Sequence, residues 1–346
     1  MQLSQNCNSR EILSAGRDCV ALGVGAMPNN PHPLAADLTL SNLAYAAGLA
    51  IRPQRQNETD SAVRARGIAS SDLSKILAEG VGSLVQRIYS AQAEHLKFCL
   101  IVPVKYLNTP TSFPAIDGDL ELEPLAEGSE IRHRPAFATT GASDAILTTF
   151  SKTVFVSRQL IINDSFGEIS RIFGGLGSSA GRVESRIVTK VLESPLDLDD
   201  EAPVFSVDSG NVIVDAGLTE STLGASMALL RNQITASGNR ADLALRHLVV
   251  SSPLEVAARK LVFSLGLPNV EITVLANLPN GRWYALADPQ IQPVVGVLRL
   301  AGSKSPVLVE QGRNDFSFDG TPVAVTADLG ATLLSRVGIV RGGVVV

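Results

Sequence analysis

The sequence has 346 residues, of which 45% are apolar and 18% charged, and its net charge is −5. This length leaves room for about two domains with a sizeable core, and the composition is ordinary for a soluble globular chain. The acidic balance argues against a nonspecific nucleic-acid-binding protein, which would be basic. The sequence also shows no apolar run long enough for a transmembrane helix and no signal-peptide pattern.

Residues that carry chemistry are scarce. Cys7, Cys19 and Cys99 are widely spaced, which fits free thiols in a reducing compartment. The four histidines form no metal-binding pair, and no nucleophile elbow or phosphate-binding loop is present. We therefore expect no catalytic residue, no cofactor and no metal.

The N-terminal part is predicted to be an arm with short helices, spanning residues 1–70, rather than a domain with its own core. Helix-like spacing covers Glu11 to Val24 and Ala35 to Ile51, and prolines between Met27 and Pro33 interrupt it. A longer helix is predicted over residues 71–97, with Ser71 as its N-cap.

Residues 98–150 predict a projecting β hairpin, because β-branched residues and prolines are frequent and residues 120–125 alternate apolar with acidic. Two strand runs are expected between Ile146 and Ile162. The charges of the hairpin change sign along the chain, since an acidic limb precedes a short basic one. We expect this region to contact the opposite charges of a neighbouring copy, through Glu127, Glu130, Arg132 and Arg134.

The longest predicted element is a helix over residues 165–193. Ser165 and Glu168 form a capping box, and Ser194-Pro195 ends the helix. A helix of this length would measure roughly 43 Å, so it either crosses a large sheet or forms the spine of an elongated subunit. Its apolar residues recur at steps of three and four along one stripe, namely Ile169, Ile172, Phe173, Leu176, Ala180, Val183, Ile187 and Val191.

Glycines interrupt this helix at positions 174, 175, 177 and 181. Each costs about 0.5–1 kcal/mol relative to alanine, so they mark either a close approach of another element or a point of flexure. We expect flexure at Gly174, Gly175, Gly177 and Gly181. The run Gly175-Leu176-Gly177-Ser178-Ser179-Ala180 also matches a dinucleotide-binding fingerprint, but that fingerprint requires a preceding strand.

The remainder predicts mixed helices and strands. A helix capped by Thr219 or Ser221 should end near Gly238, and a strand is expected at 247–250. Ser252-Pro253-Leu254-Glu255 combines a capping box with a proline at the first helical position. Asn280-Gly281 signals a hairpin. Short strands are expected at residues 204–207, 211–214, 272–275, 283–287, 294–300, 307–310 and 323–326.

Several stretches in the same order resemble the Mu-like major head subunit group of tailed-phage major capsid proteins. The resemblance covers about residues 60–338 and is carried by residues 70–77, 127–131, 156–164, 248–257, 283–289, 302–307 and 318–330. The segment from Gly16 to Leu49 is similar to the connector that joins a maturation protease to the capsid domain in some relatives. Here the sequence begins at Met1 without that protease.

The resemblance implies an α+β fold, that of tailed-phage and herpesvirus major capsid proteins. It assigns an N-terminal arm to residues 1–70, a peripheral-domain helix to 71–97, an extended β loop to 98–150, the peripheral domain to 151–214 with the spine helix at 165–193, an axial domain to 215–310 and returning C-terminal strands to 311–346.

In function, the resemblance implies a structural, non-catalytic protein of the virion, assembled in the bacterial host cytoplasm. Copies would form pentamers and hexamers that close into an icosahedral shell around double-stranded DNA, with weak nonspecific contacts to that DNA and no membrane. Portal, scaffold, maturation protease and decoration proteins are the implied partners. Some capsids of this fold crosslink through a lysine of this loop, but here only Lys105 lies in its first part and Lys152 lies in its return strand, so covalent crosslinking is not expected.

Two alternatives stay open. A nanocompartment shell of the same fold would enclose protein cargo in place of DNA. A nucleotide-binding enzyme would use Gly175, Gly177 and Ala180.

Overall fold

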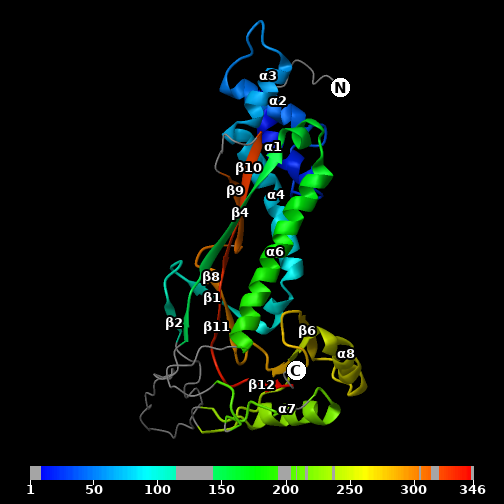
Figure 1. The fold of residues 1–346 in the computed structure, drawn as a ribbon, viewed down its shortest axis with the longest axis vertical. Coiled ribbons are helices and arrows are strands. Elements are labelled where there is room, and N and C mark those ends of the chain that lie inside the picture. Colours follow the sequence, from blue (N-terminus) through cyan, green and yellow to red (C-terminus); the bar gives the residue numbers. More distant parts are fainter. Residues whose placement is uncertain are drawn as a thin grey trace, which may run out of the picture. The chain divides into compact units, whose positions relative to one another are not determined.

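The computed structural model describes residues 9–113, 143–193, 204–207, 209–214, 217–235, 238–303, 305–312 and 319–343 (Figure 1). Two compact units divide the chain. Unit 1 combines Met1–Gln92, Thr149–Arg182 and Lys304–Asp328, and unit 2 combines Ala93–Thr148, Val183–Ser303 and Leu329–Val346. Both units contain helices and strands, as the predicted α+β class requires.

Helices dominate unit 1. They are α1 (Ser9–Gly23), α2 (Leu40–Ile51), α3 (Asp60–Ile68), α4 (Ser71–Gln92), α5 (Arg158–Ile162) and the first part of α6 (Phe166–Glu193). A three-stranded sheet completes the unit in the order β4 (Thr148–Ser157), β10 (Gly320–Leu329) and β9 (Val307–Gln311). Helix α4 packs against β9.

The predicted short helices near the N-terminus are present and share the core of unit 1. The hydroxyls of Thr39 and Thr59 cap α2 and α3. Helix α1 contacts both α2 and α4, and Leu40, Leu43 and Val63 are fully buried. The role of residues 1–70 as an arm stays a prediction.

Three local predictions for unit 1 and its border need correction. Helix α4 is capped by Ser70 and not by Ser71, because the Ser70 hydroxyl accepts the backbone N–H of Leu73 at 3.2 Å. The helix ends at Gln92, and residues 94–98 form the separate 3-10 helix η1 (Glu94–Phe98). Residues 158–162 are the helix α5 and not a strand, since Ser157 caps the N–H of Leu160 at 3.4 Å.

The described residues of unit 2 form three sheets. The first has the order β1 (Cys99–Val104), β8 (Val295–Leu300) and β11 (Ala331–Leu333). The second has the order β12 (Ile339–Gly342), β7 (Trp283–Leu286), β5 (His247–Ser251) and β6 (Glu271–Leu275). The third pairs β2 (Thr111–Phe113) with β3 (Ser143–Ala145).

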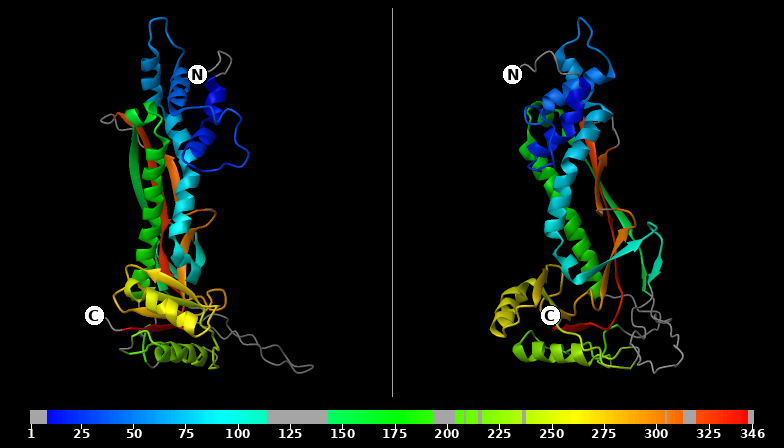
Figure 2. Two further views of the ribbon diagram at one scale, coloured as in Figure 1. Left: turned by 90° about the vertical axis from the view of Figure 1, so that its right-hand side faces the viewer. Right: turned by 180° about the vertical axis from the view of Figure 1, so that it is seen from behind.

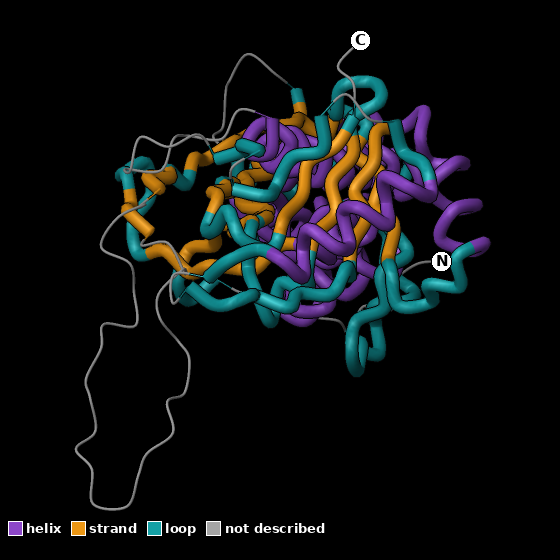
Figure 3. Tube along the Cα trace, turned by 90° about the horizontal axis from the view of Figure 1, so that it is seen from below, coloured by secondary structure: helices purple, strands orange, loops and turns teal. Residues whose placement is uncertain are grey.

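The four-stranded sheet of unit 2 has a different cover on each face. One face buries Leu248, Val250 and Trp283 beneath helices α7 (Glu220–Asn232) and α8 (Glu255–Ser264). Figure 3 shows helical segments lying across these strands. The other face buries Val249 and Tyr284 in a cluster with the last turns of α6. Alternate residues of one strand therefore serve two different cores, as the period of a strand dictates.

The predicted hairpin at Asn280-Gly281 is wrong in its pairing. Gly281 does turn the chain with a φ of +83°, but β6 and β7 are not neighbours. Strand β5 lies between them, parallel to β6 and antiparallel to β7. The apolar sequence of β5, buried at every position, suits a central strand and explains why it takes the position between the other two.

Three other predictions for unit 2 differ from the structure. Residues 204–207 form a turn, since the Asn211 side chain bonds the carbonyl of Val204 and the N–H of Ser206. The expected strand at 211–214 is reduced to one bridge, between Val212 and Arg341. The predicted capping box at 252–255 is replaced by the 3-10 helix η2 (Ser252–Leu254).

Helix α7 is capped by Thr219, one of the two residues predicted for this role, and Thr219 forms a capping box with Thr222. The helix ends at Asn232, before Gly238.

The predicted hairpin over residues 98–150 is described only at its base, where β2 and β3 pair antiparallel. Glu127, Glu130, Arg132 and Arg134 lie outside the described residues. Within the described part of the chain, no helix is both long and apolar enough to cross a membrane.

Candidate assembly surfaces

Gly174, Gly177 and Gly181 of α6 lie close to α4 inside unit 1, and the two helices run side by side (Figure 2). A Cβ added to Gly177 would lie 2.5 Å from the carbonyl oxygen of Val85. One added to Gly181 would lie 2.9 Å from the Gln92 side chain, and one added to Gly174 would lie 2.8 Å from Ile88. Close approach therefore explains Gly177, which faces the Val85 backbone, and Gly181, which faces the first carbons of the Gln92 side chain. At Gly174 the contact is only with the terminal methyl of Ile88.

Gly175 differs from the other three, because an added Cβ would meet nothing within 4 Å. Packing among the described residues does not account for this glycine. The flexure predicted for the four positions stays a prediction.

The nucleotide-binding alternative for Gly175, Gly177 and Ala180 is wrong. These residues lie inside α6, which is already helical from Phe166. The fingerprint needs a strand that turns into a helix at its first glycine, so that backbone N–H groups face a phosphate. A glycine in mid-helix has its N–H directed along the helix and offers no such turn.

The buried stripe of α6 follows a different line from the predicted one. Ile169, Phe173 and Ala180 are buried as expected, but Ile172 is 37% exposed. In the second half of the helix the buried positions include Glu184, Val188, Thr189 and Leu192. The sequence did not predict this stripe, because a search for regularly spaced apolar residues does not select the glutamate at position 184.

Glu184 holds a buried ionic network in unit 2. Its carboxylate accepts a hydrogen bond from His95 Nε2 at 2.9 Å and pairs with the Arg299 guanidinium. His95 and Glu184 are both essentially inaccessible. The Nδ1 atom of His95 has no hydrogen-bond partner among the described residues.

This network joins three segments of unit 2, because His95 lies in η1, Glu184 in α6 and Arg299 in β8. Together with desolvation, the Glu184 carboxylate raises the pKa of the neighbouring Cys99 thiol. The network has a structural role, since burial leaves it no access to a ligand. Glu184 within an apolar stripe was the signal by which sequence reasoning could have found it.

A second polar contact fixes the end of α6 to the four-stranded sheet. The Tyr284 hydroxyl donates to the Glu193 carboxylate at 2.8 Å and also lies 3.0 Å from the carbonyl of Leu192. Arg282 lies 3.3 Å from the same carboxylate. Burial and the nearby Glu193 raise the pKa of Tyr284, which therefore remains a neutral donor.

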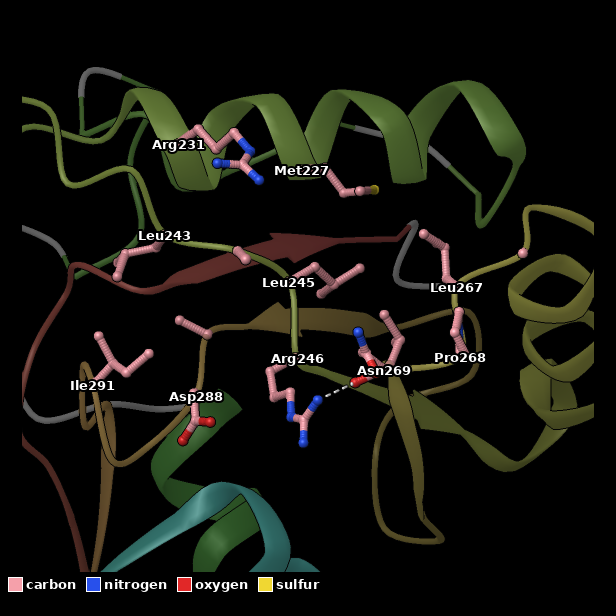
Figure 4. A pocket seen from close by; sticks show the side chains of 14 residues that line it. Met227, Arg231, Leu243, Leu245, Arg246, Leu267, Pro268, Asn269, Asp288 and Ile291 are labelled. Carbon is pink, nitrogen blue, oxygen red and sulfur yellow. Dashed lines mark hydrogen bonds between the residues drawn. The ribbon is translucent and has the colours of Figure 1, made fainter.

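A pocket of about 400 Å³ opens at the end of this sheet, where β5 and β6 begin and β7 ends. Figure 4 shows Met227 and Arg231 of α7 above the segment from Leu243 to Arg246, with Leu267 and Pro268 at one side. The lining is mostly apolar and Ile291, at its rim, is 73% exposed. Sequence reasoning did not identify this pocket, because its lining comes from four separate segments.

A model of the phage capsid protein family matches residues 141–342, which is more than half of the chain. The chain belongs to the phage capsid protein family. Members of this family are structural components of a virion shell, so the protein is structural and not an enzyme. It associates with copies of itself to build that shell.

Solved structures give a weaker likeness. The virus-like particle from Pyrococcus furiosus is 15% identical, with 76% of this chain and 97% of that chain covered and a TM-score of 0.48. A phage-related protein from Bordetella bronchiseptica is 10% identical, with 75% and 95% covered and a TM-score of 0.49. An encapsulin from Synechococcus elongatus is 10% identical, with 72% and 86% covered and a TM-score of 0.45. No curated protein matches this chain.

Proposed function

We propose that this capsid-family chain is the major head protein of a tailed phage related to the Mu-like group. In this proposal, copies form pentamers and hexamers that close into an icosahedral shell around double-stranded DNA, assembled in the host cytoplasm. The family match over residues 141–342 is the observation that carries the proposal. The order of motifs from residue 60 to residue 338 supports the finer assignment to the Mu-like group.

The parts of the subunit follow the same proposal. Residues 1–70 act as an arm, residues 98–150 as an extended loop that overlaps a neighbour, and residues 165–193 as the spine of the peripheral domain. Residues 215–310 surround the capsomer centre, where the described part contains α7, α8 and most of the four-stranded sheet. Such a shell requires further partners, namely a portal, a scaffold or a maturation protease, and in some particles a decoration protein.

Contact with DNA in this proposal is weak and independent of sequence. The net charge of −5 supports it, because a protein that bound DNA tightly along its phosphates would carry a basic surface. The genome is then held by enclosure and not by affinity.

The test is size-exclusion chromatography of the purified protein, followed by negative-stain electron microscopy of the peak. We expect capsomer rings or closed icosahedral shells. A compact monomer or dimer under conditions that permit assembly would contradict the proposal. Nuclease-protected double-stranded DNA in particles from infected cells supports a phage head, whereas protein cargo would identify a nanocompartment.

A further inference from the structure

The four cations of helix α6 lie together on one exposed face of the helix. They are Arg171, Arg182, Arg186 and Lys190, and all four side chains are exposed. Because an α-helix turns by about 100° per residue, these positions fall within one arc of about 100°, which also contains Gly175. We call the four side chains the α6 cationic stripe.

The carboxylates of α6 do not neutralise this stripe. Glu184 is buried in its ionic network, and Glu193 accepts a hydrogen bond from the Tyr284 hydroxyl. Glu168 lies in the first turn, where a negative charge complements the helix dipole. Among the residues that the structure describes, no carboxylate lies within ion-pair distance of a stripe cation.

The stripe weakens the helix that carries it. Like charges four residues apart destabilise a helix, and Arg182, Arg186 and Lys190 follow one another at this spacing. The Arg182 guanidinium donates to the neutral hydroxyl of Ser178 at 2.7 Å, which leaves its charge uncompensated. Only Lys190, in the last turn, complements the helix dipole. Positive charge gathered at a cost to the helix points to a negatively charged partner.

A rigid polyanion suits a straight stripe of this length. The helix rises by about 1.5 Å per residue, so the stripe runs for roughly 29 Å, and a DNA duplex presents one negative charge per about 1.7 Å of its axis. The exposed positions of α6, all of which the structure describes, include no aromatic residue on which single-stranded bases could stack. They also include no asparagine or glutamine that could read base edges. Such a surface contacts phosphates without sequence preference.

We propose that the α6 cationic stripe contacts the phosphates of the double-stranded DNA that the shell encloses. The inference rests on the proposed function and names the surface on which its weak contact with DNA is made. A stripe of four cations neutralises only a few phosphates, so the contact is weak and strongly dependent on salt. It also requires that this face of α6 is turned toward the interior of the shell.

The first test measures the binding of a labelled DNA duplex of random sequence to the unassembled protein by fluorescence anisotropy. A plot of the logarithm of the association constant against the logarithm of the salt concentration should have a slope of about −3 to −4 for wild type, because four phosphate contacts release that many counterions. Arg182→Gln/Arg186→Gln should weaken binding at low salt by about tenfold or more and make the slope shallower by about 2. Lys190 is kept, because a cation in the last turn also stabilises the helix end.

The matched control is Lys75→Gln/Arg259→Gln. It removes the same net charge from two other helices, where each exposed cation pairs with a carboxylate one turn away. Its salt slope should equal that of wild type. Circular dichroism confirms that each variant is folded.

The second test is crosslinking from Gly175, where an added Cβ meets nothing within 4 Å. Gly175→Cys in a Cys7→Ser background carries a photoactivatable thiol reagent, since the described cysteines, Cys19 and Cys99, are buried. Illumination should attach the bound duplex to this position and not to the control Val256→Cys, at a position that is 63% exposed on α8. Equal attachment to both positions would mean that the duplex prefers no face of the protein and would overturn the inference.

The outcomes separate this inference from the proposed function. No binding of the duplex at low salt, or an unchanged slope in Arg182→Gln/Arg186→Gln, would overturn the inference. Tighter binding of polyglutamate than of the duplex at equal charge concentration would also overturn it and assign the stripe to an acidic protein segment. Rings or shells of the wild-type protein beside any of these results leave the proposed function intact. A wild-type chain that neither associates nor binds the duplex overturns both proposals.

Discussion

At the residue scale, two buried polar groups of unit 2 have consequences for stability. Glu184 is inaccessible and is bound by His95 and Arg299, whereas His247 is buried with an Nδ1 atom that has no partner among the described residues. We therefore expect the loss of the Glu184 carboxylate, or the protonation of His247, to lower the free energy of unfolding.

Replacing Glu184 with glutamine should destabilise the protein by about 3–5 kcal/mol, because the substitution removes the buried carboxylate that pairs with Arg299 and accepts a hydrogen bond from His95. Urea unfolding of the unassembled subunit measures the change. Glu255→Gln is the matched control, since it breaks the exposed pair with Arg259 and should cost less than about 1 kcal/mol. Equal effects of the two substitutions would show that the buried network stabilises the protein no more than the exposed pair does.

His247 should make stability fall in mild acid. Burial, above all, and then the nearby Arg246 and Lys97 lower the pKa of His247, although Glu271 and Asp288 oppose the shift. A histidine whose pKa is lower in the folded state binds fewer protons there, so stability is complete above the unfolded pKa of about 6.5 and declines as the pH falls through it. Unfolding of wild type and His247→Gln at pH 7.5 and pH 5.5 measures this, and the variant should lose less stability between them.

At the scale of elements, the packing of α6 on α4 and the charges of the extended loop are the features to test. Gly177 and Gly175 lie two residues apart on the same helix, but only Gly177 faces another backbone, at Val85. They form a matched pair, because alanine at either position gains the same helix propensity while the steric cost of its Cβ differs.

Gly177→Ala should destabilise unit 1 by about 1–3 kcal/mol, because its Cβ would push α4 away. Gly175→Ala should instead stabilise it by up to about 1 kcal/mol, since alanine is the better helix former and the space is open. Thermal unfolding followed by circular dichroism compares the two. A loss of stability in Gly175→Ala would mean that another part of the protein approaches that position.

The extended loop should lose its charge contact in Arg132→Glu/Arg134→Glu. If these arginines pair with carboxylates of a neighbouring copy, assembly at low salt should weaken, and added salt should reduce the difference from wild type. Light scattering during assembly measures both. Normal assembly of this variant at low salt would show that charge does not hold the loop in place.

At the scale of the whole molecule, we propose that the shell passes from a compact to an expanded form and that the subunit flexes at α6 during this change. Gly175→Ala stiffens the helix without a clash, so it tests flexure apart from packing. Expansion of assembled particles, followed by electron microscopy over time, should be slower than in wild type. An unchanged rate would argue that Gly175 has no part in expansion.

The sequence by itself was sufficient for what local patterns determine. The spacing of apolar residues predicted α4 and α6 to within a few residues of the ends, and the strands β5, β6, β7 and β8 were placed closely. Ordered motifs predicted the capsid family, which the match over residues 141–342 confirms. Such features depend on neighbours along the chain, which a sequence shows directly.

Only the tertiary structure decided features that depend on distant segments. The order β12-β7-β5-β6 separates β6 from β7, although Asn280-Gly281 is a sound hairpin signal, because pairing energy depends on all the strands that compete. The ionic network joins residues 95, 184 and 299, and the pocket gathers residues from 227 to 291. Long-range burial and charge pairing set these contacts, and no local pattern in the sequence records which distant residues will meet.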